Sequence, residues 1–197
     1  MLNADFAIVF PAFFVFLVLQ AFNCNRTGID IGKSVAVEYT LFVMKVRSAN
    51  IIDAKAIYSL ITYYAEQDKM LFRSMADIYE DLHDFLVAEA DCNIVGCCAF
   101  QIIWSDLAEI KSLAVDQAST GLGVGKALVN AAVERACQLG VLRVFALTLE
   151  PYFFEKMGFK IIAKETLPEK VWKDCARCPK QDNCDETAVI KTVSGDR

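Results

Sequence analysis

Three alternating glycines, Gly121, Gly123 and Gly125, separate an apolar strand pattern from an amphipathic helix pattern, and they constrain the fold more than any other feature. Glycine lets the backbone approach a ligand closely and adopt left-handed conformations. The helix predicted to begin near Gly123 presents unpaired N–H groups and the positive end of its dipole. A strand, a glycine loop and a helix in this order therefore predict a site for a phosphate group.

Other glycine-rich loops fit the sequence less well. A dinucleotide-binding fingerprint has the pattern Gly-x-Gly-x-x-Gly, whereas the glycines here alternate. A P-loop would need glycine in place of Thr120 and serine or threonine in place of Ala127. A simple turn is the remaining alternative, and the strand before the loop, the helix after it and the aromatic segment at residues 153–159 favour the phosphate site.

The hydrophobic periodicity predicts an α/β domain with a mixed central sheet of about seven strands flanked by about four helices. Asp53 is expected to cap the first helix, Ser74 and Asp77 to form a capping box at the second, and Gly140 to end the third. Strands are expected at residues 44–47, 85–89, 94–104, 107–115, 141–147, 159–163 and 187–193. Helices are expected at residues 53–67, 74–82, 123–140 and 151–157.

The chain divides into an extension at residues 1–43, a domain at residues 44–193 and a short tail at residues 194–197. Residues 6–22 are apolar apart from Gln20, and this length is close to the ~17 residues that a membrane-spanning helix needs. A cleaved signal peptide is disfavoured, because no basic residue precedes the segment. Two interpretations stay open: a membrane anchor, and an upstream extension that the working protein lacks.

The 197 residues carry a net charge of −5 and include eight cysteines. This length suits one hydrophobic core, and the negative charge implies no basic surface for nucleic acid. Cys97, Cys98 and Cys137 lie within apolar runs and are expected to be buried thiols. Free thiols favour a reducing cytoplasm over a secreted disulfide scaffold.

Residues 109–126, together with the segment Phe-Phe-Glu-Lys-Met-Gly-Phe at residues 153–159, resemble the GNAT superfamily of N-acetyltransferases. The coenzyme A motif of that family is Arg or Gln, two residues, Gly, any residue, then Gly or Ala. Residues 120–125 match it except at Thr120. The resemblance implies the GNAT fold, acetyl-CoA as cosubstrate, and a V-shaped opening for it between strands 107–115 and 141–147. The cofactor-binding residues that it implies are Leu113, Val115, Thr120, Gly121, Leu122, Gly123, Val124, Gly125 and Lys126.

More specifically, the chain is similar to the short N-acetylglutamate synthases, which lack an amino-acid kinase domain. The similarity lies in residues 71–80, 109–115 and 170–186. It implies transfer of the acetyl group to L-glutamate, the first step of arginine biosynthesis, in the cytoplasm. The alternatives are another amino acid, an amine or a protein N-terminus as acceptor, and a non-catalytic acyl-CoA sensor. A homodimer is compatible with this interpretation, and a membrane partner is expected only if residues 6–22 form an anchor.

Direct attack of an amine on a thioester needs a base, an oxyanion donor and an acid for the leaving thiolate. Glu109, on a strand beside the glycine loop, is the candidate base, with a solvated strand glutamate as the alternative. The resemblance implies the backbone N–H of Leu113 as oxyanion donor. Phe154 occupies the position where the family often has a tyrosine that acts as the general acid. Tyr152 is the remaining candidate acid, although two residues turn it about 200° away along a helix; otherwise the thiolate leaves to solvent.

An acidic amino acid carries carboxylates, which call for cations. Arg73 and Lys111 are the candidate substrate-binding residues, since both lie in segments similar to the synthases. Arginine can grip a carboxylate with two N–H groups, whereas lysine acts as a point charge. The alternative for each is an ordinary surface charge.

Cys175, Cys178 and Cys184 have Cys-x2-Cys spacing followed by a third thiol, which is typical of a partial zinc site. The sequence shows no evident fourth ligand, with Asp185 or a water as the options. A thiol-bearing loop that forms a disulfide is the alternative. The cluster is therefore interpreted as either zinc-binding or redox-active, and no metal is predicted.

Overall fold

The computed structural model describes residues 43–168, 175–176 and 178–193. The strands are β1 (Met44–Ser48), β2 (Phe85–Ala90), β3 (Asn93–Trp104), β4 (Leu107–Val115), β5 (Arg143–Thr148), β6 (Lys160–Ile162) and β7 (Thr187–Thr192). The α-helices are α1 (Ala54–Ala65), α2 (Met75–Glu80), α3 (Val124–Gln138) and α4 (Pro151–Glu155). Short 3-10 helices lie at Ile51–Asp53, Leu82–Asp84, Gln117–Ser119, Lys164–Thr166 and Gln181–Asn183.

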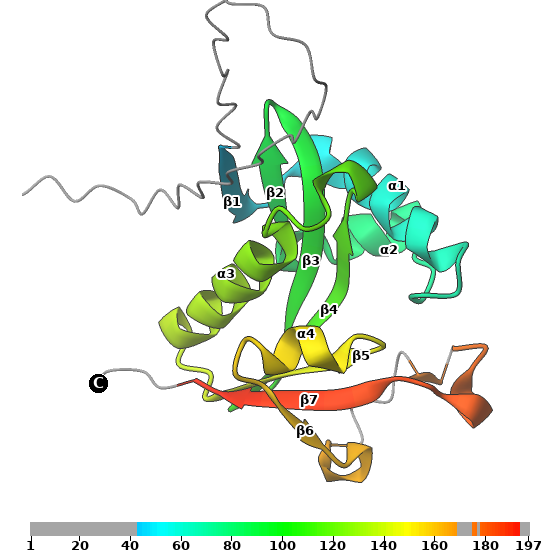
Figure 1. The fold of residues 1–197 in the computed structure, drawn as a ribbon, viewed down its shortest axis with the longest axis vertical. Coiled ribbons are helices and arrows are strands. Elements are labelled where there is room, and N and C mark those ends of the chain that lie inside the picture. Colours follow the sequence, from blue (N-terminus) through cyan, green and yellow to red (C-terminus); the bar gives the residue numbers. More distant parts are fainter. Residues whose placement is uncertain (1–42, 169–174, 177, 194–197) are drawn as a thin grey trace, which may run out of the picture.

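The seven strands form one sheet in the order β1-β2-β3-β4-β5-β7-β6 (Figure 1). Strands β4 and β5 are parallel, and every other neighbouring pair is antiparallel. Helices α3 and α4 pack on one face, and α1 and α2 cover the other. The mixed sheet and the helices predicted from hydrophobic periodicity are confirmed.

Helix starts follow the predicted capping chemistry at α2 but not at α1. The capping box of Ser74 and Asp77 is confirmed. At α1 the side chain of Asn50 caps the 3-10 helix that leads into the α-helix, so the prediction that Asp53 is the cap is wrong. The buried carboxylate of Asp53 instead accepts hydrogen bonds from the N–H of Asn50 and from Arg47 of β1. The Arg47 guanidinium holds the pKa of Asp53 below its usual range.

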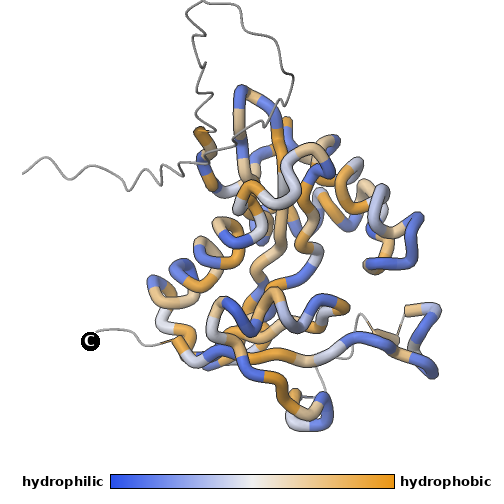
Figure 2. Tube along the Cα trace, viewed as in Figure 1, coloured by the Kyte–Doolittle hydropathy of each residue, from blue (hydrophilic) through white to orange (hydrophobic). Residues whose placement is uncertain are grey.

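Each face of the sheet buries its own apolar cluster. Figure 2 shows hydrophobic residues concentrated on the strands. Along α3, hydrophilic and hydrophobic residues alternate. This alternation is the amphipathic pattern expected of a helix that lies on a sheet. Buried residues on the α3 side include Phe100, Ile110, Leu128 and Phe154. Buried residues on the α1 side include Ile57, Ile61, Ile78 and Phe85.

Two of the three thiols predicted to be buried are buried. Cys97 and Cys98 are completely inaccessible, and burial raises the pKa of Cys97 to about 12. The third thiol, Cys137, is exposed, so the prediction for it is wrong. Cys137 follows the buried Ala136 in α3, and one step along a helix turns the side chain about 100° away from the sheet.

Strands β4 and β5 stay together over only part of their length. They pair at Leu107 with Arg143, Ala108 with Val144, and Glu109 with Phe145. Beyond Glu109 the register between them ends, and the two ribbons separate in Figure 1. The two strands therefore diverge in a V, as the resemblance implies, and a separated strand presents N–H and C=O groups that an extended ligand can bind.

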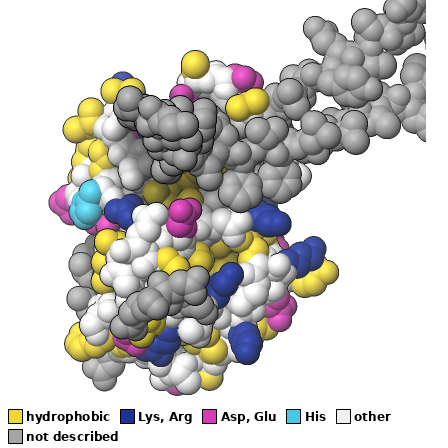
Figure 3. Space-filling view, turned by 90° about the vertical axis from the view of Figure 1, so that its left-hand side faces the viewer, with side chains coloured by type: hydrophobic (Ala, Val, Ile, Leu, Met, Phe, Trp, Pro, Cys, Tyr) yellow, Lys and Arg dark blue, Asp and Glu magenta, His cyan; other side chains and the backbone are white. Residues whose placement is uncertain are grey.

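Charged side chains of both signs lie on the surface. On the face drawn in Figure 3, basic side chains lie around an apolar area, with acidic side chains among them. Elsewhere Arg143 pairs with Asp106 at 2.7 Å, and Lys180 pairs with Asp185 at 3.4 Å. The charges on this face are therefore mixed rather than uniformly basic.

Several predictions concern residues 1–42, 169–174, 177 and 194–197, which lie outside the described residues. They include the apolar segment 6–22, most of the extension, the short tail, and part of the synthase-like segment 170–186. Within the part of the chain that the structure describes, no helix combines the length and the hydrophobicity needed to cross a membrane.

Candidate active site

The glycine loop leads from β4 into α3, as the sequence predicts. Gly121 and Gly123 have φ angles of 81° and 85°, in the left-handed region that glycine adopts without strain. Gly123 is the N-cap of α3. A Cβ atom on either glycine would meet none of the described atoms within 4 Å. The backbone in front of this helix is therefore open to a ligand, as a phosphate cradle requires.

The other residues of the loop are not equally suited to bind phosphate. The N–H of Leu122 donates to the carbonyl of Ser119 at 3.3 Å, so it is already engaged. The hydroxyl of Thr120 donates to the carbonyl of Asp116 at 3.4 Å and does not replace the longer side chain of the family motif. The N–H groups of the first turn of α3 (residues 124–126) are the better donors, because the first turn of a helix has no intrahelical acceptors.

Gly125 lies beside the aromatic segment 153–159. A Cβ atom at Gly125 would lie 3.4 Å from the ring of Phe153 in α4, an ordinary van der Waals distance. The start of α3 therefore lies against α4.

The sheet face opposite α3 carries two apolar clusters with a polar row between them. Strands β3 and β4 pair so that Gln101 lies beside Glu109 and Ala99 lies beside Lys111. Because side chains alternate along a strand, Gln101, Glu109 and Lys111 point to the same face and form this polar row. The flanking apolar residues are Phe85, Val87 and Ala99 on one side and Ile103, Leu107 and Phe145 on the other.

Glu109 stands at the apex of the V-shaped opening. It is the last residue of β4 that pairs with β5, and only 8% of its surface is exposed. The alternative of a solvated strand glutamate therefore does not describe its surroundings. Glu109 is therefore a buried carboxylate at the point where β4 and β5 diverge.

Lys111 forms a hydrogen bond with Gln101, a residue that the sequence analysis did not identify. The Nζ atom of Lys111 donates to Oε1 of Gln101 at 2.8 Å. Gln101 is the one polar side chain with an amide or a charge among residues 97–104. This isolated position within an apolar strand is the signal that could have identified it.

Arg73 lies over the same face of the sheet. Its guanidinium carbon is 5.9 Å from the ring centre of Phe85. Its Nη2 atom pairs with Asp81, and only 13% of the side chain is exposed. Its Nη1 atom is buried and has no hydrogen-bond partner among the described residues. Buried N–H groups normally have an acceptor, and a substrate carboxylate would supply one.

A bulge interrupts β4 where the oxyanion donor is expected. Cys97 pairs with Ala114, but Ala99 pairs with Lys111, so two residues of β4 face one of β3. Ser112 in this bulge has a φ angle of 52°. A bulge takes backbone groups out of the regular ladder, and the residue after Ser112 is Leu113, the predicted donor. Farther along β4, the carbonyl of Val115 accepts the hydroxyl of Tyr64 at 2.6 Å.

Tyr152 and Phe154 lie on opposite sides of α4, as their spacing predicts. Tyr152 is 67% exposed, and Nζ of Lys156 lies 4.1 Å from its ring centre. Phe154 is 3% exposed and packs against Phe153 and Phe159. The position that often carries the acid in the family is therefore filled by an apolar ring.

The tail cysteines lie close to charged groups and to the polar row. Nζ of Lys164 is 3.2 Å from Sγ of Cys184, which is 4.0 Å from Oε2 of Glu186. Burial raises the pKa of Cys175, and the charges of Glu186 and Glu109 raise it further. Within the described parts of the chain, no group of three or more His, Cys, Asp or Glu residues could hold a metal ion.

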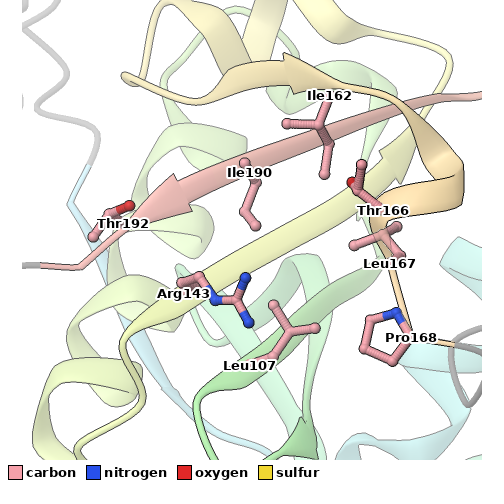
Figure 4. Close-up of a pocket in the computed structure, with 8 residues that line it drawn as sticks. All are labelled: Leu107, Arg143, Ile162, Thr166, Leu167, Pro168, Ile190 and Thr192. Atoms are coloured by element: carbon pink, nitrogen blue, oxygen red, sulfur yellow. The ribbon is translucent and has the colours of Figure 1, made fainter.

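Two hollows lie near the sheet. One of about 320 Å³ lies under the 3-10 helix Lys164–Thr166, at the first residues of β4 and β5 (Figure 4). It is at the opposite ends of these strands from the glycine loop, so it does not belong to the V-shaped opening. A second hollow of about 250 Å³ lies between α1 and the end of β4. Residues lining the first hollow are Leu107, Arg143, Ile162, Thr166, Leu167, Pro168, Ile190 and Thr192.

Comparison with known sequences places the chain in a family. The family described as acetyltransferase (GNAT) domain matches residues 81–161. An uncharacterised N-acetyltransferase from Chlorobaculum tepidum is 44% identical over 148 residues, which cover 75% of this chain and 96% of the relative. An amino-acid acetyltransferase from Mycobacterium tuberculosis is 38% identical over 135 residues, covering 67% of this chain and 77% of the relative.

Solved structures that resemble this fold include proteins described as binding coenzyme A. The protein Rv2747 from Mycobacterium tuberculosis, in complex with CoA and NLQ, has a TM-score of 0.67 and 31% identity, covering 76% of this chain and 99% of that one. N-acetylglutamate synthase from Neisseria gonorrhoeae, complexed with coenzyme A and N-acetyl-glutamate, has a TM-score of 0.71 and 26% identity. The match covers 79% of this chain but 36% of that longer one. With its glycine loop, split strands and these relatives, the chain belongs to the GNAT acetyltransferase family and is an acyltransferase.

Proposed function

We propose that this protein transfers the acetyl group of acetyl-CoA to the amino group of L-glutamate, the first step of arginine biosynthesis. The observation that carries the proposal is the polar row at the apex of the opening, where Glu109 and Lys111 share one sheet face with Arg73. A carboxylate and two cations on one sheet face suit an acceptor that brings one ammonium and two carboxylates. The amino-acid acetyltransferase relatives and the N-acetylglutamate synthase structure support the same choice.

Binding of acetyl-CoA falls to the glycine loop and the free edge of β4. The first turn of α3 supplies N–H donors for the pyrophosphate, and Lys126 adds a positive charge. Gly121 and Gly123 leave the space in front of these donors open. The backbone of β4 beyond Glu109, including Leu113, can bond the amide groups of the pantetheine arm.

The residues of the polar row and their neighbours have separate roles in the proposed reaction. Glu109 accepts the proton that the acceptor ammonium must lose, directly or through a water. The N–H of Leu113, beside the bulge, donates to the thioester oxygen as that oxygen gains negative charge. Arg73 and Lys111 hold the carboxylates of the acceptor. Tyr152 points to solvent and Phe154 has no proton to donate, so we assign protonation of the leaving thiolate to solvent.

A cytoplasmic location fits this proposal. Cys97 and Cys98 are buried free thiols, and Cys92, Cys175, Cys178 and Cys184 are also free. Free thiols persist in a reducing compartment. Residues 44–193 are the catalytic domain in this proposal.

The test is turnover of acetyl-CoA by the full chain with single amino acids as acceptors. We expect L-glutamate to be the best acceptor, and glutamine, which lacks the side-chain charge, to be poorer. Faster acetylation of neutral or basic amines would contradict the glutamate assignment. Binding of acetyl-CoA without any turnover would favour the alternative that Phe154 suggests, a non-catalytic acyl-CoA sensor.

A matched pair of glycine variants tests the coenzyme site by calorimetry. Gly123→Asp places a negative charge where the pyrophosphate is expected, so the affinity for coenzyme A should fall by at least about 100-fold. Gly140→Asp is the control, because Gly140 also has a left-handed φ angle, 72°, and open space around it, but lies at the other end of α3. Both variants place a side chain at a left-handed backbone position. Equal affinities for coenzyme A in the two variants would refute the site.

A further inference from the structure

Lys111 is a flexible point charge, so its value as a carboxylate-binding group depends on what holds it. A lysine side chain loses rotamer entropy when it is fixed in one position. In this protein one contact that holds it is the 2.8 Å hydrogen bond from Nζ to Oε1 of Gln101. Gln101 itself lies on β3, a central strand of the sheet, which makes it a rigid support.

The position of Gln101 also places it beside the candidate base. Gln101 pairs directly with Glu109 across strands β3 and β4, and both side chains point to the face opposite α3. Directly opposed residues in an antiparallel pair have Cβ atoms about 4.5–5.5 Å apart. The residue at position 101 is therefore next to both charged members of the polar row.

A neutral amide suits this position better than a charged or an apolar side chain. An apolar side chain would leave Nζ of Lys111 without this acceptor. A carboxylate would accept the same hydrogen bond, but it would neutralise Lys111 and repel Glu109 and the carboxylates of the substrate. An amide oxygen orients the ammonium and leaves its charge available for an anionic acceptor.

We propose that Gln101 is a positioning residue that fixes the ammonium of Lys111 for an acceptor carboxylate and thereby favours acidic acceptors. This inference rests on the proposed function and adds a residue to it that touches Lys111 rather than the reacting atoms. Among the described residues packed near Lys111, Asp84 is also within its electrostatic reach. The amide of Gln101 supplies a hydrogen-bond acceptor for this ammonium from the central strand β3.

The experiment compares Gln101→Met and Gln101→Glu in the full chain, with steady-state kinetics for glutamate, glutamine and acetyl-CoA. Methionine keeps the length of the side chain and removes the acceptor, so KM for glutamate should rise roughly ten-fold, with kcat and KM for acetyl-CoA within about two-fold. Gln101→Glu should raise KM for glutamate further than Gln101→Met does. Its effect on glutamine, which carries one carboxylate fewer, should be smaller.

The control is Gln138→Met on the exposed side of α3, where the amide of Gln138 donates to Glu134 at 3.4 Å. Thermal denaturation establishes that each variant is folded. The inference would be refuted, and the proposed function left intact, if the wild type acetylates glutamate and both Gln101 variants have the KM for glutamate of the wild type. A glutamate KM in Gln101→Glu equal to that of the wild type would have the same consequence. Failure of the wild type to acetylate glutamate would instead refute the proposed function, and the inference with it.

Discussion

The two faces of the central sheet are built from the same strands but perform different tasks. On the α3 side, buried apolar residues run without interruption from β2 to β7, with α3 and α4 packed on them. On the opposite side the apolar surface is divided in two, and Gln101, Glu109 and Lys111 occupy the gap. The continuous face buries apolar area that stabilises the fold, whereas the divided face carries the polar row that we propose for the acceptor. Substitutions on the two faces should therefore change different quantities.

The largest expected effect is on the divided face. If Glu109 removes the proton of the acceptor, Glu109→Gln should lower kcat by about 10²–10⁴-fold with little change in acetyl-CoA binding. Glu134→Gln, on the exposed surface of α3, is the control and should keep normal kinetics. A loss of less than about ten-fold in kcat for Glu109→Gln would exclude it as the base.

A substitution on the continuous face should act on stability instead. Leu128 in α3 is completely buried, so Leu128→Ala should lower the free energy of unfolding by about 2–5 kcal/mol. Urea denaturation measures this change, and KM for glutamate should be unchanged under conditions where the variant is folded. The control is Leu139→Ala, since Leu139 is 53% exposed and surface changes usually cost within about 0.5 kcal/mol. Similar costs at the two positions would mean that the α3 face is not the main store of stability.

A third prediction separates binding from chemistry within the divided face. Arg73→Ala should raise KM for glutamate by about 10–100-fold, because a charge-assisted hydrogen bond contributes roughly 1.5–3 kcal/mol. The value of kcat should stay within a few-fold, in contrast to Glu109→Gln. Arg143→Ala is the matched control, since Arg143 is also paired with an aspartate but is 46% exposed and lies at the start of β5, outside the opening. An unchanged KM in Arg73→Ala would make Arg73 a purely structural residue.

The smallest expected effect concerns the extension. A shortened chain that begins at Met44 should have the same Tm and the same kinetics as the full chain, because β1 begins at Met44 and the apolar clusters of the described residues are built from there onward. Differential scanning calorimetry and the glutamate assay measure both. Loss of activity in the shortened chain would show that residues 1–43 contribute to the enzyme, and membrane association of the full chain alone would support the anchor interpretation.

The features that the sequence determined by itself are local ones. The glycine loop before α3 follows from the order of strand, glycines and helix. The capping box at Ser74 and the left-handed Gly140 at the end of α3 follow from residues within one helical turn of each other. In each case, the interacting groups are close in sequence, so the residue pattern contains the necessary information.

Tertiary structure decided the features that depend on strands far apart in the chain. Periodicity shows that Gln101 shares a face with Ala99, but only the register of β3 with β4 places it beside Glu109. Only the early end of pairing between β4 and β5 puts Glu109 at the apex of the opening. Asp53 is a residue type that often caps helices, yet its carboxylate instead accepts a hydrogen bond from Arg47 of β1. The physical reason is that a side-chain pattern fixes which residues of one strand point the same way, whereas neighbours, register and ion pairs arise only when the strands assemble.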